Sequence, residues 1–364
     1  MKILHIAEMY FTKASGITSA VPPFIEAQNK VEGVSSKLLL SSGVDIPKGF
    51  NYNFEVININ DIDNLNYFFN DIYKPDLVIF HGVYFMNYIK IYKILRKLNI
   101  SYVVKPHCSL TEQAQKKKRV KKYISNLIFF NKFLKNAKAI SFLNEGERRT
   151  SIRINPNSII IGNGIDKIKQ VDKKSKEELE IIYLGRIDFY HKGLDFLLDA
   201  IELIKDKLSN EKIKINIYGK GSETEVKKLN EIILKININN LKFKGPVYDE
   251  EKDRVFKKAN ILILTSRFEG LPMTILEALS YGIPCIVTPG TNVSEEINNN
   301  NAGWKTSTNP KEIANTILIA INEYKKSEDK YIKDTATLVE KKYLWNSIAD
   351  MSINKYRLLL KNSM

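Results

Sequence analysis

Short runs of apolar residues alternate with stretches of helical periodicity along most of the chain, and this alternation is its most restrictive feature. Such a pattern predicts parallel strands joined by helices that cover the sheet, and so an α/β fold. We expect one series of strands at residues 3–6, 76–80, 101–104, 139–142 and 158–161, and a second at 181–184, 213–218, 261–265 and 283–287.

The two series predict two domains, as does the length of 364 residues. A polar, lysine-rich stretch separates them, and we place the boundary there, between an N-terminal domain of residues 1–171 and a C-terminal domain of residues 172–342. Residues 343–364 have apolar side chains at helical intervals and predict a helix that crosses back toward the first domain. Ligands of such sheets bind beyond the carboxyl ends of the strands, which makes the cleft between two domains the expected site.

Positive charge is concentrated in the first half of the chain. Residues 1–170 carry 25 Lys+Arg against 13 Asp+Glu, within a total net charge of +15. The densest part is a run of cations followed by Tyr123, Leu127, Phe130 and Leu134 at helical spacing, which predicts a basic amphipathic helix. The cations of this run are Lys116, Lys117, Lys118, Arg119, Lys121 and Lys122.

The basic helix has three possible uses: contact with an anionic membrane surface, a solvated face, or contact with nucleic acid. Each cation near an anionic leaflet contributes about 1 kcal/mol, so six could hold a protein there reversibly. We favour the membrane, with the solvated face as the main alternative. We expect no nucleic-acid partner, because no nucleic-acid-binding motif accompanies the charge.

The remaining composition predicts a cytoplasmic protein, placed peripherally on the inner face of the cell membrane by its basic helix. No apolar run approaches the roughly 20 residues of a membrane span, and the first residues lack the features of a signal peptide. Cys108 and Cys285 are far apart in sequence and belong to no Cys/His cluster, so neither a disulfide nor a metal site is expected.

Two cations flank a predicted strand-to-helix turn. Arg186 and Lys192 follow the strand at 181–184 and precede an amphipathic segment at 196–204. A guanidinium and an ammonium beside the amides of a helix start suit a diphosphate. A polar turn with surface charges is the alternative reading.

Two glutamates bracket another predicted helix start. Glu269 precedes Gly270, Leu271 and Pro272, and Pro272 is well placed to open a helix in which Glu277 lies about two turns along. The amides near Gly270 and Leu271 should face an anion, and the carboxylates should reach different parts of one extended ligand. Alternatively, Glu277 is an exposed helix residue and Glu269 a charge favoured by the helix dipole.

These segments resemble glycosyltransferase family 4. Glu269 and Glu277, eight residues apart, look like its E-x7-E element, and further elements match in the expected order. They are Asn163-Gly164-Ile165-Asp166, Gly185-Arg186-Ile187-Asp188 and His191-Lys192-Gly193. The resemblance implies a GT-B fold of two Rossmann-like domains with a cleft between them, and retention of anomeric configuration without a metal.

The resemblance also implies site residues. Arg186 and Lys192 would bind the donor diphosphate, Glu277 the ribose, and Glu269 the sugar. His107 and Glu269 are the two catalytic candidates. Gly16 resembles a glycine loop near the donor phosphates, although this family usually has two adjacent glycines where this chain has Ser15-Gly16. The turn at Gly219 and Lys220 resembles the one that faces the base. Of the other three histidines, we expect His5 and His191 to be structural. His81 is a weaker candidate for a residue on the acceptor side.

The implied reaction is transfer of a hexose or N-acetylhexosamine from a nucleotide sugar, with UDP favoured, to a glycan acceptor, with a lipid-linked or otherwise membrane-held glycan favoured. Bacterial cell-surface polysaccharide synthesis is the expected setting, and the nucleotide sugar is a co-substrate rather than a cofactor. A UDP-sugar epimerase of the same fold and a non-catalytic basic binding protein are the alternatives. Asp61-Ile62-Asp63 has the DxD spacing of metal-dependent transferases, but it lies in an Asn-rich stretch and is discounted.

Overall fold

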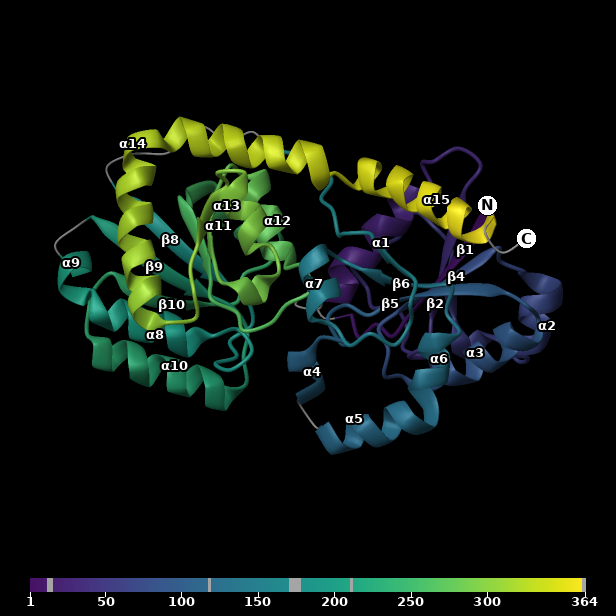
Figure 1. Ribbon diagram of the computed structural model, residues 1–364. Helices are drawn as coiled ribbons and strands as arrows, with labels where there is room; N and C mark the ends of the chain where they lie inside the picture. The colour runs from purple at the N-terminus through teal and green to yellow at the C-terminus, as the bar shows by residue number, and fades with distance from the viewer. Residues whose placement is uncertain (12–15, 117–118, 170–177, 210–211, 362–364) are drawn as a thin grey trace. The chain divides into compact units, whose positions relative to one another are not determined.

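The chain folds into two compact units in a computed structural model that describes residues 1–11, 16–116, 119–169, 178–209 and 212–361. Unit 1 comprises residues 1–166 together with 345–364, and unit 2 comprises residues 167–344 (Figure 1). The predicted boundary between residues 171 and 172 lies outside the described residues. No helix of the described residues is both long and apolar enough to cross a bilayer.

Unit 1 is built on a seven-stranded parallel sheet in the order β3-β2-β1-β4-β5-β6-β7. The predicted strands of this half are present, and β2 and β3, which we did not predict, extend the sheet beyond β1. The strands are β1 Lys2–Ala7, β2 Ser35–Leu40, β3 Val56–Asn58, β4 Leu77–His81, β5 Ser101–Lys105, β6 Ala139–Phe142 and β7 Ser158–Ile160.

Helices cover both faces of this sheet because successive strand residues point to opposite sides. Leu4 and Ile6 of β1 join the core beneath α3, whereas Ala7 packs with Val21 and Ile25 of α1. The helices of unit 1 are α1 Gly16–Gln28, η1 Ile59–Asp61, α2 Leu65–Tyr67, η2 Phe68–Ile72, α3 Met86–Lys97, α4 Glu112–Lys116, α5 Arg119–Ser125, η3 Asn126–Phe130, α6 Asn131–Lys135, α7 Glu145–Thr150 and α15 Trp345–Lys361.

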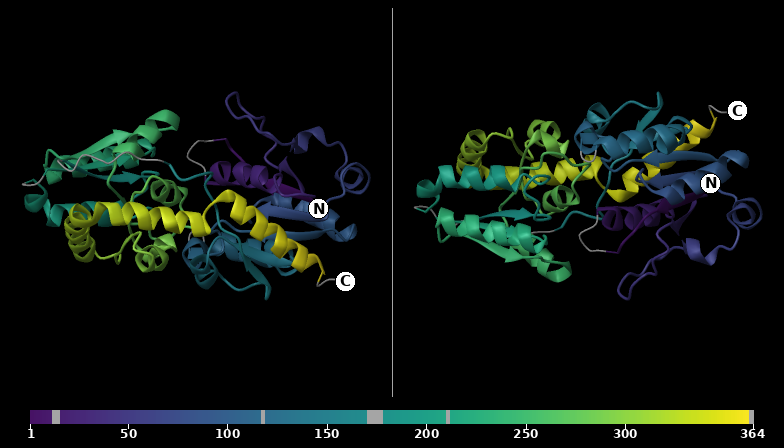
Figure 2. Two further views of the ribbon diagram at one scale, coloured as in Figure 1. Left: turned by 90° about the horizontal axis from the view of Figure 1, so that it is seen from above. Right: turned by 90° about the horizontal axis from the view of Figure 1, so that it is seen from below.

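The last helix of the chain, α15, packs against α1 in unit 1 (Figure 2). Trp345 stacks on Phe24 of α1 with ring centroids 5.7 Å apart, and the Nζ of Lys355 donates to the carbonyl oxygen of Ile160 at 2.7 Å. Unit 1 is therefore assembled from the two ends of the sequence.

Unit 2 contains a six-stranded parallel sheet in the order β10-β9-β8-β11-β12-β13. Consecutive apolar residues make β11 fully buried, and it occupies the middle of the sheet as expected. The strands are β8 Leu179–Leu184, β9 Ile213–Tyr218, β10 Leu241–Gly245, β11 Ile261–Leu264, β12 Cys285–Val287 and β13 Gly303–Lys305. The helices are α8 Leu194–Leu203, α9 Lys205–Ser209, α10 Glu223–Ile236, α11 Asp249–Lys258, α12 Met273–Ser280, η4 Pro289–Thr291, α13 Ser294–Asn299 and α14 Pro310–Lys342.

Gly193 joins the loop after β8 to α8, and its backbone conformation and its surroundings both require glycine. Its φ is +64°, and an added Cβ would lie 2.0 Å from the carbonyl oxygen of Thr265. Gly245, at the end of β10, has a similar φ of +80° with nothing within 4 Å of its Cβ position. A side chain would strain the backbone at both positions, but only at Gly193 would it also collide with a neighbouring atom.

We therefore predict that Gly193→Ala destabilises the protein much more than Gly245→Ala. The strained backbone should cost each variant about 1 kcal/mol, and the conflict with Thr265 should cost Gly193→Ala a further 1–3 kcal/mol, roughly. Urea unfolding monitored by tryptophan fluorescence measures the difference. Equal losses would contradict the close contact between this loop and β11.

Candidate functional site

Loops that follow β8, β9 and β11 converge at the carboxyl edge of the unit 2 sheet. The backbone N–H of Ile187 donates to the carbonyl oxygen of Lys220 at 2.9 Å, and that of Arg267 donates to the carbonyl oxygen of His191 at 3.0 Å. These contacts bring together the predicted segments around Arg186, Lys192, Gly219 and Glu269.

Gly219 allows the loops after β8 and β9 to touch. A Cβ at this position would lie 1.7 Å from the carbonyl oxygen of Gly185, so a larger residue would force the two loops apart. The neighbouring Lys220 has its carbonyl oxygen engaged by Ile187 and its side chain exposed. This turn therefore offers backbone close to the Arg186 segment and one exposed cation.

The guanidinium of Arg186 is tethered to its own loop and remains half exposed. Its Nη2 lies 2.5 Å from Nδ1 of His191 and 3.5 Å from Oδ2 of Asp188. A guanidinium only donates, so Nδ1 of His191 must accept. The ring of His191 stacks on Phe268 at a centroid distance of 4.2 Å. Burial lowers the pKa of His191, and the nearby cations reinforce this, so a neutral imidazole holds Arg186 in place.

Lys192 and Glu269 form an ion pair between the loops after β8 and β11. The Nζ of Lys192 donates to Oε1 of Glu269, which also accepts from the hydroxyl of Ser266 at 2.9 Å. Both side chains are largely buried, at 15% and 11% exposed. Burial alone would raise the pKa of Glu269, but the charge and hydrogen bond of Lys192 lower it below its ordinary value. The carboxylate is therefore ionised and fixed in position.

The turn that carries Glu269 leads directly into α12. Gly270 and Leu271 are buried in this turn, Pro272 precedes the first helical residue, and no side chain caps the helix start. The side-chain amide of Asn292 donates to the carbonyl oxygen of Glu269 at 2.5 Å. The position of Pro272 is as expected, and donation from the Gly270 and Leu271 amides to an anion stays a prediction.

Glu277 lies farther along α12 and has a different partner. Its Oε1 accepts from Nζ of Lys252, on α11, at 2.6 Å. Its Oε2 is buried and has no hydrogen-bond partner among the described residues. One oxygen of this carboxylate thus has unused capacity to accept a hydrogen bond, as a hydroxyl-binding role would need.

Sequence reasoning missed several residues that shape this site. Arg267 makes a bidentate ion pair with Asp195, at 2.8 and 2.6 Å, and stacks over Phe196. Ser266, Asn292 and Lys252 also contact the two glutamates. Their spacing carries no motif, because each acts through a contact between distant loops, so nothing in the pattern of the sequence could have identified them.

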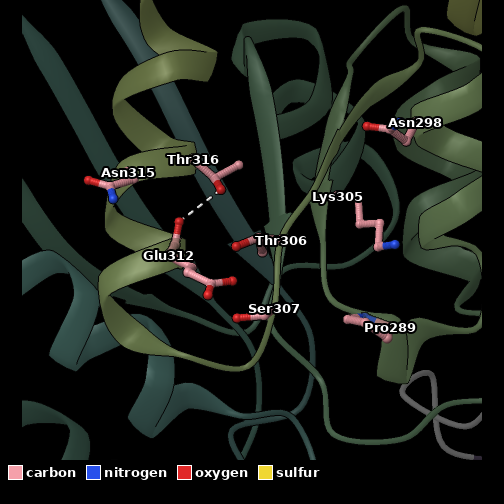
Figure 3. A pocket seen from close by; sticks show the side chains of 8 residues that line it. All are labelled: Pro289, Asn298, Lys305, Thr306, Ser307, Glu312, Asn315 and Thr316. Carbon is pink, nitrogen blue, oxygen red and sulfur yellow. Dashed lines mark hydrogen bonds between the residues drawn. The ribbon is translucent and has the colours of Figure 1, made fainter.

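A separate pocket lies at the β13 edge of unit 2 and includes none of the predicted site residues (Figure 3). It is bordered by Lys305 at the end of β13, by Thr306 and Ser307 just after it, and by Glu312 and Thr316 of α14. Its polar lining brings no pair of opposite charges together comparable to that of Lys192 and Glu269.

In unit 1, His107 is the end of a chain of three hydrogen-bonded histidines. Nδ1 of His5 lies 2.9 Å from Nε2 of His81, and Nδ1 of His81 lies 3.0 Å from Nε2 of His107. At the other end, Nε2 of His5 lies 2.8 Å from Oε1 of Gln28 on α1. We call His5, His81 and His107 the histidine chain. His5 and His81 were not expected to connect to His107.

Two buried charges stand beside the histidine chain. Burial lowers the pKa of Lys105 to about 7, and its Nζ lies 4.8 Å from the ring centroid of Phe24. The carboxylate of Glu147 accepts from the backbone N–H groups of Cys108, at 2.5 Å, and Leu143, at 2.7 Å. Glu147 thereby fixes the turn after β5, where His107 and Cys108 have φ values of +49° and +62°.

Gly16 is the first residue of α1 and is exposed, with nothing within 4 Å of its Cβ position. Ser15 lies outside the described residues. A close approach of this backbone to a phosphate therefore stays a prediction.

From Arg119 to Lys135 the basic segment forms α5, the π-helical η3 and α6 rather than one regular α-helix. Of its predicted apolar stripe, Phe130 and Leu134 are buried, but Tyr123 and Leu127 are 69% and 67% exposed. Val120, Ile124, Ile128 and Phe129 are exposed as well. Lys116, Arg119 and Lys121 are exposed, whereas Lys117 and Lys118 lie outside the described residues.

The metal-binding alternative that we discounted rests on Asp61 and Asp63. Asp61 and Asp63 are exposed around η1, and no group of three or more His, Cys, Asp or Glu within the described ranges could hold a metal ion.

Residues 164–337 match the family model described as Glycosyl transferases group 1. Among curated proteins, an uncharacterized 41.2 kDa protein in the cps region of Klebsiella pneumoniae is 24% identical over 226 residues, 58% of this chain and 59% of that protein. Lipopolysaccharide 1,6-galactosyltransferase of Escherichia coli K12 is 37% identical over 112 residues, 30% of either chain. The chain thus matches less than two thirds of the length of these relatives.

Solved structures resemble the chain over nearly its whole length. TarM has a TM-score of 0.78 at 15% identity, covering 99% of this chain and 98% of its own. Anabaena HepE in complex with UDP and glucose has a TM-score of 0.71 at 16% identity, covering 98% and 99%. The fold is therefore GT-B, with two Rossmann-like domains, as the sequence predicted.

The ion pair predicts opposite pH dependences with and without Lys192. With Lys192 present, the lowered pKa of Glu269 means that its contribution to stability is present above the unfolded pKa of roughly 4.3 and is lost on acidification. In Lys192→Met, burial should instead raise the pKa of Glu269, so that its contribution falls as the pH rises from roughly 4.5 toward neutrality.

The measurement is unfolding free energy from pH 3.5 to 7.5 for the wild type, Glu269→Gln, Lys192→Met and the double variant. Each pairwise difference isolates the carboxylate. The same pH trend in both backgrounds would rule out the assigned role of Lys192.

Proposed function

We propose that this chain, whose residues 164–337 match the family model of the group 1 glycosyl transferases, transfers a hexose or N-acetylhexosamine from a UDP-linked donor to a glycan acceptor. Transfer retains anomeric configuration, requires no metal, and follows the pattern of family 4. The observation that carries this proposal is the meeting of Arg186, Lys192 and Glu269 at the carboxyl edge of the unit 2 sheet.

The cations of this edge suit a departing diphosphate. Arg186 is half exposed and held by His191, and Lys192 lies beside the start of α12, where the helix dipole favours negative charge. Fixed donors stabilise charge as it develops in the transition state without reorganising. We assign Arg186, Lys192, Gly270 and Leu271 to the diphosphate, and Gly16 to a close backbone approach to the donor phosphates.

The carboxylates suit hydroxyl groups at the two ends of the donor. Glu269, ionised and buried, accepts from sugar hydroxyls, and the unpartnered Oε2 of Glu277 accepts from the ribose. Gly219 and Lys220 line the base. His107 is the second catalytic candidate, after Glu269, and binds the donor sugar. The likeness to HepE, whose structure holds UDP and glucose, supports UDP as the nucleotide.

Substitutions of the two glutamates should separate turnover from nucleotide affinity. Glu269→Ala should lower kcat on the order of 100-fold, because it removes a group that contacts the reacting sugar, with little change in UDP affinity. Glu277→Gln, on the same helix, should instead weaken UDP binding by roughly tenfold, the equivalent of one hydrogen bond to a charged group.

Thermal shift with UDP, GDP and ADP, followed by turnover with the corresponding sugars, measures both effects. Unchanged turnover in Glu269→Ala would defeat its assignment. A new UDP-sugar formed from donor alone would indicate the epimerase, and steeply salt-dependent nucleic-acid binding without donor binding would indicate the basic binding protein.

The acceptor in this proposal is a lipid-linked glycan of cell-surface polysaccharide synthesis, reached from the cytoplasmic side of the membrane. The exposed apolar side chains of α5 and η3 stand among exposed cations, and this combination suits insertion at an anionic leaflet. The relatives from a cps region and from lipopolysaccharide synthesis support this setting.

Replacing Leu127 and Ile128 together by serine should weaken binding to vesicles containing phosphatidylglycerol by roughly tenfold or more, since two apolar side chains would no longer be buried in the bilayer. Lys116→Gln with Lys121→Gln should weaken it in a salt-dependent way. Leu234→Ser, at a 76% exposed leucine of unit 2, is the matched control. Vesicle sedimentation measures binding, and unaltered binding in both double variants would remove the membrane from the proposal.

A further inference from the structure

The orientation of the Gln28 amide decides which nitrogen of each ring in the histidine chain donates and which accepts. A neutral imidazole has one N–H donor and one acceptor nitrogen, so each ring passes its polarity to the next. Oε1 of Gln28 can only accept, and it lies 2.8 Å from Nε2 of His5. His5 therefore carries its proton on Nε2 if the amide of Gln28 is oriented in this way.

Two buried serines orient that amide. The hydroxyl of Ser352, on α15, donates to the carbonyl oxygen of Ala349 at 2.7 Å. Its oxygen is then left to accept from Nε2 of Gln28 at 3.0 Å. On the other side, the hydroxyl of Ser36 donates to Oε1 of Gln28 at 3.0 Å. If the amide were flipped, the hydroxyl of Ser352 would have to donate to Oε1 of Gln28 instead of to Ala349, and the hydroxyl of Ser36 would lose its acceptor.

Once the tautomer of His5 is fixed, the hydrogen bonds between the rings fix the tautomers of His81 and His107. Nδ1 of His5 then has a lone pair and accepts a hydrogen bond from Nε2–H of His81. Nδ1 of His81 in turn accepts a hydrogen bond from Nε2–H of His107. Burial and the neighbouring Lys105 lower the pKa of each ring, to about 3 for His5 and His107, so a doubly protonated ring that would break this sequence is disfavoured.

We propose that Gln28 and the histidine chain hold His107 as its Nε2–H tautomer, so that Nδ1 accepts a hydrogen bond from a hydroxyl of the sugar donor. This Nδ1 has no hydrogen-bond partner among the described residues, and the side chain of His107 is only partly buried. Gln28, His5 and His81 are positioning residues. Ser352, on α15, contributes by fixing the orientation of the Gln28 amide. The contact with a donor rests on the proposed function, whereas the tautomer does not.

The tautomer can be tested on the free protein. In the full chain with 15N-labelled histidine at pH 7.5, long-range 1H–15N correlation should show the Nε2–H pattern for His5, His81 and His107. Single His→Asn variants assign the signals and separate them from His191. A His107 that is protonated on Nδ1, or on both nitrogens, would overturn the proposal even if the protein transfers sugar.

Variants test whether the proton order is set from Gln28. Gln28→Leu should give mixed tautomers at His107, and Ser352→Ala should shift them in the same direction while changing less of the core. Ser141→Ala is the matched control, because this buried hydroxyl has no hydrogen-bond partner among the described residues. Circular dichroism confirms folding. An unchanged His107 spectrum in folded Gln28→Leu and Ser352→Ala would contradict the relay.

Donor analogues test what Nδ1 does. A fluorine replacing a hydroxyl can accept but cannot donate, so the fluoro analogue should lose as much activity as the deoxy analogue at the hydroxyl read by His107, about tenfold for one hydrogen bond. A fluoro analogue that restores activity there would show a donor at His107 and sink this part. Absence of turnover with every UDP-, GDP- and ADP-sugar would sink the proposed function and leave the tautomer result standing.

Discussion

The ion pair of Lys192 and Glu269 is the contact on which the candidate site of unit 2 depends. It joins the loops that follow two neighbouring strands, and it does so with both side chains largely buried. A buried pair contributes little net stability, because desolvation offsets most of its attraction, but removal of either partner is costly. Its value here is geometric, since it places an ionised carboxylate and a cation side by side before any ligand arrives.

The backbone around this pair is organised for the same purpose. Gly193 and Gly219 permit close approaches between loops, and Asn292 and Arg267 fix the remaining segments by hydrogen bonds. The parallel sheet supplies the common edge at which these loops meet. The sheet topology brings the loops to one edge, and short-range contacts between the loops then determine the geometry of the site.

The sequence was most informative where chemistry and burial coincide in one short segment. The central strand β11 is apolar on consecutive residues, and the Glu269 to Glu277 segment combines a turn, a proline and two carboxylates. Edge strands such as β10 and β13 were missed because lysine and glycine interrupt their apolar pattern. The histidine chain was missed because it joins β1, β4 and the turn after β5 through side chains that are 76 and 26 residues apart, a contact that only the strand order creates.

The placement of α15 has a consequence for how the chain matures. Unit 1 receives α15 only after the whole of unit 2 has been synthesised. Until then the ring of Phe24 lacks Trp345, and the amide of Gln28 lacks Ser352. A nascent chain can thus complete its second folding unit before its first, and a nonsense codon between the segments that encode unit 2 and α15 would impair the unit whose strands are encoded earlier.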